Sequence, residues 1–141
     1  MKIKKVLILT SIFSIIWPQI AFASFSDVSS SSPDYVAINY LQENGILQGY
    51  SDGTFRPDQP VNRAEFLKII LEGSHIDLTS DNSTLPFTDT DENAWYAPYV
   101  RTAFNLQVIE GYEDSTFRPA QTINKAETLK ILGKVQSWPV K

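Results

Sequence analysis

Two basic residues, Arg63 and Lys125, stand at matching positions 62 residues apart. Each follows an asparagine and precedes a glutamate by two positions, a spacing typical of the first turn of a helix. The helix dipole opposes a cation there by about 0.3 to 1 kcal/mol. Two interpretations stay open. The side chains and the free amides of the helix start could bind an anion such as a carboxylate or phosphate of a cell-surface polymer, or the side chains could pair with carboxylates of this acidic chain.

Arg56 and Arg118 form a second pair of repeated cations, each inside a loop that contains an aspartate, Asp52 or Asp114. A guanidinium in such a loop can clamp a ligand or pair with the aspartate of its own loop, and we favour the pairing. Because each arginine precedes a proline, we expect extended backbone at both positions. Three aromatic residues could stack on sugar rings, although packing is the commoner role of such residues: Tyr50, Tyr112 and Trp95.

Metal and nucleophile chemistry lack their usual residues in this sequence. His75 is the only histidine and there is no cysteine, so a zinc site or a histidine-based nucleophile would be incomplete. The stretch 89–93 resembles the opening of a calcium loop, but Ala94 stands where glycine is required and no glutamate follows at the twelfth position. We therefore expect no metal and no cofactor. We also expect no enzymatic activity, because the two repeats leave no room in the chain for a catalytic domain.

The candidate residues belong to an internal duplication. The segment Gly49–Pro57 returns 62 positions later as Gly111–Pro119, and the same offset carries Asn62-Arg-Ala-Glu65 onto Asn124-Lys-Ala-Glu127. The offset also places Phe25-Ser-Asp27 on Phe87-Thr-Asp89. Nearly all of the chain beyond residue 24 therefore consists of two tandem units, and function is to be sought in what both units keep.

Each unit predicts a helix, an ordered loop and a second helix. Apolar residues at spacings of three and four indicate a first helix over about 34–43, ended by Asn44-Gly45. Phe55 and Phe117 are expected to anchor the loops in the core. Capping boxes should start the second helices, whose expected buried stripe includes Leu129; the cap residues are Asn62, Glu65, Asn124 and Glu127. The predicted fold is mainly α, with tandem helix-loop-helix repeats packed together as a small helical domain.

The first 23 residues predict a signal peptide, because three lysines precede an apolar run and Ala21-Phe22-Ala23 is a small-x-small cleavage site; a retained anchor is the alternative. After cleavage nine basic residues remain against sixteen acidic ones, a formal charge of −7. We therefore expect no nucleic-acid partner and no stable membrane insertion. The predicted organisation is a signal peptide (1–23), repeat 1 (24–73), a linker (74–86), repeat 2 (87–135) and a tail (136–141).

The repeated motifs resemble the S-layer homology domain of bacterial envelope proteins. The resemblance rests on Gly49–Pro57 with Val61–Glu65, and on Gly111–Pro119 with Ile123–Glu127. It covers about residues 25–73 and 87–135, and two ordered motifs that each occur twice make it specific.

This resemblance implies an exported, non-catalytic module on the cell surface, in the cell wall or S-layer. Such modules bind secondary cell-wall polysaccharide, often pyruvylated, or another envelope glycan. The family's basic ligand contact carries over to Arg63, and less fully to Lys125, which lacks the two-pronged donor of arginine. The family's usual unit has three repeats around a pseudo-threefold axis, whereas this chain has two. The alternative is therefore a structural protein that oligomerises or pairs with another such protein to complete a three-repeat unit.

Overall fold

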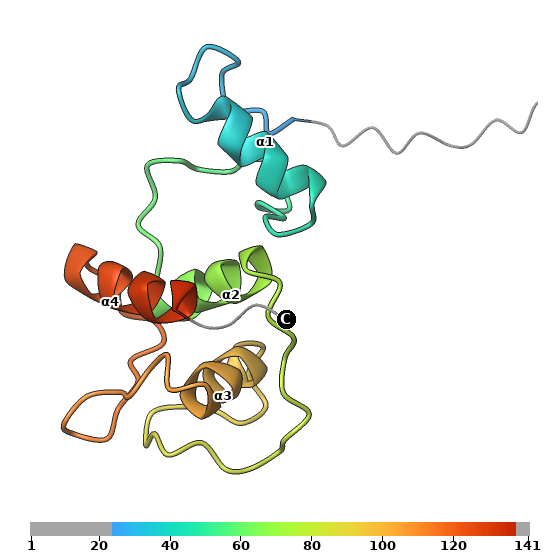
Figure 1. Cartoon of the computed structure of the whole chain (residues 1–141). Coiled ribbons are helices and arrows are strands. Elements are labelled where there is room, and N and C mark those ends of the chain that lie inside the picture. The colour runs from blue at the N-terminus through green and yellow to red at the C-terminus, as the bar shows by residue number, and fades with distance from the viewer. Residues whose placement is uncertain (1–23, 138–141) are drawn as a thin grey trace, which may run out of the picture.

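The computed structural model describes residues 24–137, so the predicted signal peptide and residues 138–141 lie outside the described part. Four helices form in this part and no strand does: α1 (Tyr35–Glu43), α2 (Arg63–Gly73), α3 (Ala97–Asn105) and α4 (Lys125–Gln136). Figure 1 shows α2 and α4 crossing in the middle of the molecule, with α1 on one side of them and α3 on the other. The expected mainly α fold of two helix-loop-helix repeats is confirmed.

The predicted capping boxes start the second helix of each repeat. Asn62 Oδ1 accepts a hydrogen bond from the Glu65 amide at 2.9 Å, and Glu65 Oε2 accepts one from the Asn62 amide at 2.9 Å. Asn124 and Glu127 repeat the arrangement at 2.9 and 3.1 Å. These bonds satisfy amides that a helix start otherwise leaves unpaired, so the cap residues fix where α2 and α4 begin.

The first helix of repeat 1 also begins and ends near its expected place, and α3 lies at the matching position of repeat 2. Asp34 is the residue before α1, and Gly45 follows the helix with a φ of +73°, a backbone angle that glycine adopts without strain. In α3, Pro98 lies in the first turn, where a missing backbone amide costs nothing.

The buried residues form two cores of unequal size. The main core draws on α2, α3 and α4 and includes Phe117 and Phe87. The smaller one contains Phe25, Val28 and Ile38, with Phe55 packed against it. The expected anchoring of both loop phenylalanines thus takes different forms, because Phe117 is 1% exposed whereas Phe55 stays half-buried.

The buried stripe expected on α4 is wrong at Leu129, which is 59% exposed. The residues of α4 that enter the core are Ile131 and Val135. In α2 a second side is buried as well, because this helix contacts both α3 and α4. The spacing of apolar residues therefore predicts only part of the buried side of α4. Leu129 would be buried only if another segment of protein packed on the side of α4 that faces away from the core.

The two loops have one shape, and it is set by aspartates that precede the first helices. The carboxylate of Asp27 accepts hydrogen bonds from the amides of Phe55 and Arg56 at 2.8 and 2.7 Å, and Asp89 binds the second loop in the same way. The expected extended backbone is wrong at Arg56 and Arg118, whose φ angles are +60° and +59°. The clamped amides hold each arginine in the left-handed region despite the following proline.

Candidate functional site

The two repeats are joined through Arg63, which is only 6% exposed. Its Nε donates a hydrogen bond to the Phe117 carbonyl oxygen at 2.8 Å, and its Nη1 lies 3.3 Å from Glu127 Oε1. The guanidinium also lies over the rings of Tyr112 and Phe117, 4.8 and 4.9 Å from their centroids. A cation from the first repeat is therefore buried against residues that all belong to the second.

The backbone at the start of α2 is bound to the second repeat as well. The amides of Arg63 and Ala64 donate to the carbonyl oxygens of Gln121 and Pro119 at 2.9 and 3.1 Å. The amide of Ile123 donates in return to the Val61 carbonyl oxygen. The amides of Arg63 and Ala64, which the sequence suggested as anion-binding groups, are thus hydrogen-bonded to carbonyl oxygens. An anion at this junction therefore has to be bound by side chains.

A cavity of about 220 Å³ opens beside Arg63. We call it the second groove; Arg63 is its contribution from the first repeat, and its other lining residues come from the second, Val108, Ile109, Glu110, Gly111, Tyr112, Glu127, Lys130 and Ile131. The basic residue of one motif and the Gly-Tyr pair of the next copy's loop therefore share one cavity.

Hydrogen bonds tie the ionisable groups of the second groove together. The Tyr112 hydroxyl donates to Glu127 Oε1. Burial raises the pKa of Glu127, but the bonds from Tyr112 and the Asn124 amide, with the charge of Arg63, outweigh it and hold that pKa below its usual value. Burial and the bond to Glu127 raise the pKa of Tyr112. Glu127 is therefore a carboxylate at neutral pH, and it neutralises Arg63.

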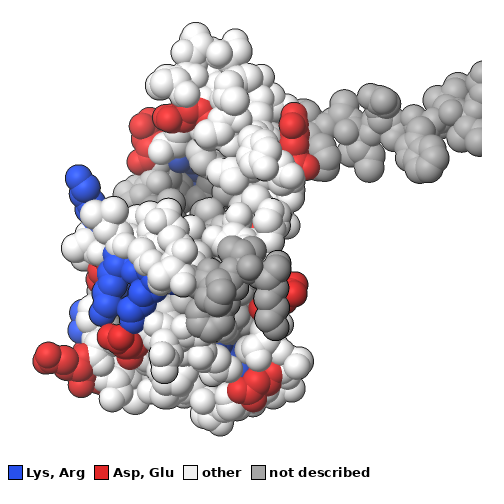
Figure 2. Space-filling view, viewed as in Figure 1, with Lys and Arg blue, Asp and Glu red and all other residues white. Residues whose placement is uncertain are grey.

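Two lysines share the carboxylate of Glu110; Lys130 lines the second groove and Lys134 lines a neighbouring cavity. Lys130 Nζ lies 3.2 Å from Glu110 Oε2 and Lys134 Nζ lies 2.6 Å from Glu110 Oε1, and these bonds, Lys134 first, hold the pKa of Glu110 below its usual value. One positive charge is thus left over. Figure 2 shows basic surface gathered on the α4 side of the molecule, with acidic surface beside it.

The first repeat carries an equivalent cavity of about 470 Å³, which we call the first groove. Each of the eight second-repeat residues of the second groove has its counterpart here, 62 positions earlier: Ile46, Leu47, Gln48, Gly49, Tyr50, Glu65, Lys68 and Ile69. Among the described residues, none plays the part of Arg63, because no repeat precedes the first one there. Trp95 lies at this groove, 55% exposed and edge-on to Tyr96.

The loop arginines pair inside their own loops, as the favoured interpretation expected. Arg56 Nη2 lies 2.9 Å from Asp52 Oδ2, and Arg118 Nη2 lies 2.9 Å from Asp114 Oδ2. Each guanidinium also lies over a tyrosine ring of its own loop, at 3.9 Å from the Tyr50 centroid and 4.0 Å from that of Tyr112. A sugar could therefore reach the ring face that each arginine covers only by displacing that arginine.

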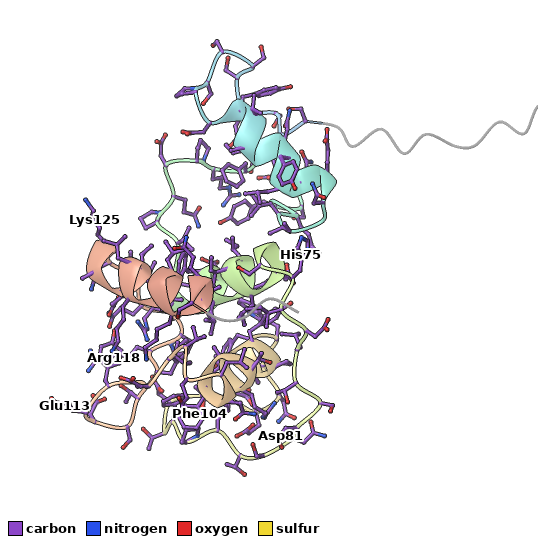
Figure 3. The ribbon with its side chains drawn as sticks, viewed as in Figure 1. His75, Asp81, Phe104, Glu113, Arg118 and Lys125 are labelled. Carbon is purple, nitrogen blue, oxygen red and sulfur yellow. The ribbon has the colours of Figure 1, made fainter. Side chains whose placement is uncertain are left out.

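Lys125 lies away from both grooves. Figure 3 shows its side chain at the exposed start of α4, pointing away from the rest of the molecule, and it makes no hydrogen bond or ion pair with any described residue. Arg63 and Lys125 are thus equivalent in sequence and opposite in environment, since one is buried at a junction and the other is exposed at an end.

Sequence reasoning overlooked Glu110 and Lys130 as residues of the second groove, and Asp27 and Asp89 as clamps of the loops. The repeat offset contains a signal for three of them, because Asp27 matches Asp89 and Lys130 matches Lys68. Glu110 matches Gln48 and carries no such signal.

Residues 24–137 include no helix with the length and the apolar character needed to cross a bilayer. Nor do three or more His, Asp or Glu side chains come together in this range in a way that could hold a metal ion.

Comparison with known proteins matches two segments of the chain, 24–67 and 86–129, to the model of the S-layer homology domain. A cellulosome-anchoring protein of Acetivibrio thermocellus is 34% identical over 115 residues, which are 79% of this chain and 25% of that protein. Cell surface glycoprotein 1 of the same organism is 30% identical over 78% of this chain and 5% of its own length. A surface layer protein of Brevibacillus choshinensis is 27% identical over 89% of this chain and 12% of its own.

The chain belongs to the S-layer homology domain family, because the family model matches more than half of it. It spans a quarter or less of the length of these curated relatives. Membership makes it a cell-envelope attachment module of an exported, cell-surface protein, as the sequence predicted.

Proposed function

We propose that this chain binds secondary cell-wall polysaccharide or a related envelope glycan, without catalysis, and that the second groove is its main site. One observation carries the proposal: Arg63 of the first repeat lies in the same cavity as Gly111 and Tyr112 of the second. The family's two motifs thus meet in one groove, although they stand about 50 residues apart in the sequence. The cellulosome-anchoring relative supports an anchoring role.

The charges of the second groove favour an acidic glycan. An anionic group of the glycan competes with Glu127 for the guanidinium of Arg63, whose planar fork suits a carboxylate. Lys130 and Lys134 supply the positive charge that Glu110 leaves unbalanced. The groove lining itself is balanced, with Arg63 and Lys130 against Glu110 and Glu127. On a chain that is acidic as a whole, an anionic ligand would recognise these cations together with Lys134 beside the groove.

The remaining candidate residues have subsidiary roles in this proposal. Trp95 is the most exposed of the candidate rings and offers a stacking surface at the first groove. Tyr50 and Tyr112 contribute their hydroxyl groups, since Arg56 and Arg118 cover their faces. Lys125 is a weaker glycan contact, because it lies outside both grooves.

Retention on purified wall sacculi tests the proposal, with sacculi of Brevibacillus choshinensis as the probe before and after removal of their attached polysaccharide. We expect Lys130→Gln to weaken retention by roughly tenfold, the effect of one charge-assisted hydrogen bond. Lys68→Gln is the matched control, because it makes the same change in the groove that lacks the arginine. Arg63→Lys keeps the charge but loses the fork, and we expect it to weaken retention further.

Equal retention of all folded variants, or equal retention on stripped sacculi, would refute the assignment of the second groove. Release of reducing sugar from the sacculi by the purified chain would refute the absence of catalysis.

A further inference from the structure

The helices α2 and α4 hold matching places in their repeats, yet one side of α4 is left uncovered by residues 24–137. Leu67 of α2 is 0% exposed, and its counterpart Leu129 of α4 is 59% exposed. The same reversal holds along the whole side: Arg63, Ala64, Leu67 and Leu71 are buried, whereas Lys125, Ala126, Leu129 and Gly133 are exposed. The outer side of α4 thus has the sequence pattern of a docked helix without the surface that covers it.

The second repeat provides the surface that covers α2. Helix α3 packs along α2 and contributes three residues to the main core that both helices share, Ala97, Val100 and Ala103. The loop after Phe117 supplies three carbonyl oxygens, from Phe117, Pro119 and Gln121, to the side chain of Arg63 and to the amides of Arg63 and Ala64. The matching amides of Lys125 and Ala126 receive no such partner within residues 24–137.

The first repeat carries an equivalent covering surface, on which none of the described helices is docked. The counterparts of the three carbonyl groups belong to Phe55, Pro57 and Gln59, which line the first groove and accept no backbone hydrogen bond from a described residue. Glu65 lies in this groove at the position of Glu127. The larger volume of the first groove, about 470 against about 220 Å³, fits a surface from which the docked segment is missing.

The sizes of the side chains on the two uncovered surfaces are complementary. Where α2 has Leu71, α4 has Gly133, and where α3 has Ala103, α1 has Leu41, which lines the first groove. Volume lost from the docking helix is thus regained on the surface that would receive it. Lys125 and Glu65 keep the opposite charges of the Arg63–Glu127 pair.

We propose that a second copy of this chain covers these surfaces. Helix α4 of one copy packs on α1 and the first groove of another, as α2 packs on α3, and Lys125 meets Glu65. The contact is head-to-tail, so it closes into a ring or extends, according to the rotation between neighbouring copies. It buries Leu129, and it completes the first groove with a cation from the neighbouring copy. Nothing in it depends on glycan binding by the second groove.

Sedimentation velocity of the exported chain over a wide concentration range tests the contact. We expect the mean mass at least to double, and Leu129→Glu and Ala37→Lys each to remain monomeric. Ala37 is exposed on α1 and matches Tyr99, whose hydroxyl donates to Glu72 of α2. The counterpart of Glu72 on α4 is Lys134, so a lysine at position 37 would face a like charge in the contact. Leu78→Glu is the control, because it makes the same substitution at an exposed leucine of the linker, and it should assemble like the wild type.

Mixing the two monomeric variants separates this contact from any symmetric one. Each variant keeps one intact surface, so the mixture should form a 1:1 complex that does not grow further. A wild type that is monomeric throughout, variants that assemble normally, or a mixture that stays monomeric would each overturn the proposal.

Cysteine cross-linking locates the contact, because the chain has no cysteine of its own. Lys125→Cys and Gln59→Cys are the counterparts of Arg63 and Gln121, whose backbones are hydrogen-bonded at 2.9 Å. A mixture of the two variants should form a disulfide-linked dimer on mild oxidation. Leu78→Cys mixed with Gln59→Cys should not, and equal cross-linking of both pairs would overturn the proposed geometry.

Discussion

The two repeats have the same loop and the same helix cap, yet they hold these parts with different strength. In the second repeat, Phe117 is buried and its carbonyl oxygen is bound by Arg63. In the first, Phe55 packs on Phe25 with a centroid distance of 5.4 Å, in a small cluster apart from the main core. The loops agree because their internal bonds are repeated. Their burial differs because only the second loop has a helix from another repeat docked on it.

This difference separates the roles of residues that are equivalent in the sequence. Within one repeat, the motif determines the backbone of the loop and the cap of the second helix. Between repeats, the same motif forms a contact, from α2 to the second repeat, and this contact occurs once in the described chain. The same position is therefore a structural junction at Arg63 and an exposed end at Lys125.

The largest effect is expected from alanine substitutions at these two positions. Arg63→Ala leaves Glu127 without its cation and the Phe117 carbonyl oxygen without its donor. Breaking a buried pair in this way costs about 3 kcal/mol. Lys125→Ala should change the free energy of unfolding by less than about 0.5 kcal/mol, as is usual for an exposed residue. Urea unfolding followed by far-UV circular dichroism measures both.

The double variant Arg63→Ala with Glu127→Gln serves as the control for this pair. It removes the uncompensated charge and should recover part of the lost stability. Equal effects of Arg63→Ala and Lys125→Ala would show that the junction contributes nothing to stability.

The sequence contains enough information for the local parts of this fold. The asparagine and glutamate at fixed spacing predict the starts of α2 and α4, because a capping box is formed by residues near in sequence. Asn44-Gly45 predicts the end of α1 for the same reason. The left-handed backbone of Arg56 and Arg118 escapes such reasoning, because the aspartates that impose it lie 29 residues earlier.

The candidate site was predictable in its residues but not in its geometry. The repeated motif singles out Arg63 and Tyr112, yet nothing local shows that they come from different repeats to line one cavity. Leu129 shows that a residue pattern does not by itself predict burial. Its position on the helix predicts that it is buried, but burial also requires another segment to pack against it, and the motif contains no information about that segment.

The second largest effect is expected at the glycines after the short apolar pairs. Gly49 and Gly111 have φ angles of +65° and +78°, and a Cβ atom on either would overlap the ring of Phe25 or Phe87. Gly111→Ala should lower the free energy of unfolding by about 2 kcal/mol, from the strained angle and the overlap together. Gly49→Ala should lower it less, since Phe25 belongs to the smaller core.

Gly53→Ser is the control for these glycine substitutions. Gly53 also has a positive φ, but no atom lies near its missing Cβ, and its counterpart Ser115 already adopts a φ of +60°. We expect stability close to that of the wild type, measured by the same urea titration. If Gly53→Ser were as damaging as Gly111→Ala, backbone strain alone would explain both results and the ring overlap would be irrelevant.

The smallest effect concerns acid stability of the two loops. The hydrogen bond from the Thr54 hydroxyl, followed by that from Arg56, lowers the pKa of Asp52 from 3.8 to about 2. The pKa of Asp114 is lowered in the same direction, by Thr116 and then Arg118. Because the folded-state pKa is the lower one, this stabilisation is present above about pH 4 and is lost as the pH falls towards 2.

Asn substitutions at these aspartates should therefore flatten the fall of the urea midpoint between pH 4 and 2. Asp114→Asn should change global unfolding more than Asp52→Asn does, because the second loop is tied to the main core through Phe117. Asp58→Asn is the control, since this carboxylate makes no hydrogen bond or ion pair with any residue in 24–137.

A pH profile that is equally steep in all three variants would mean that the loop carboxylates do not govern acid stability. An effect of Asp52→Asn equal to that of Asp114→Asn would mean instead that the first repeat unfolds together with the main core.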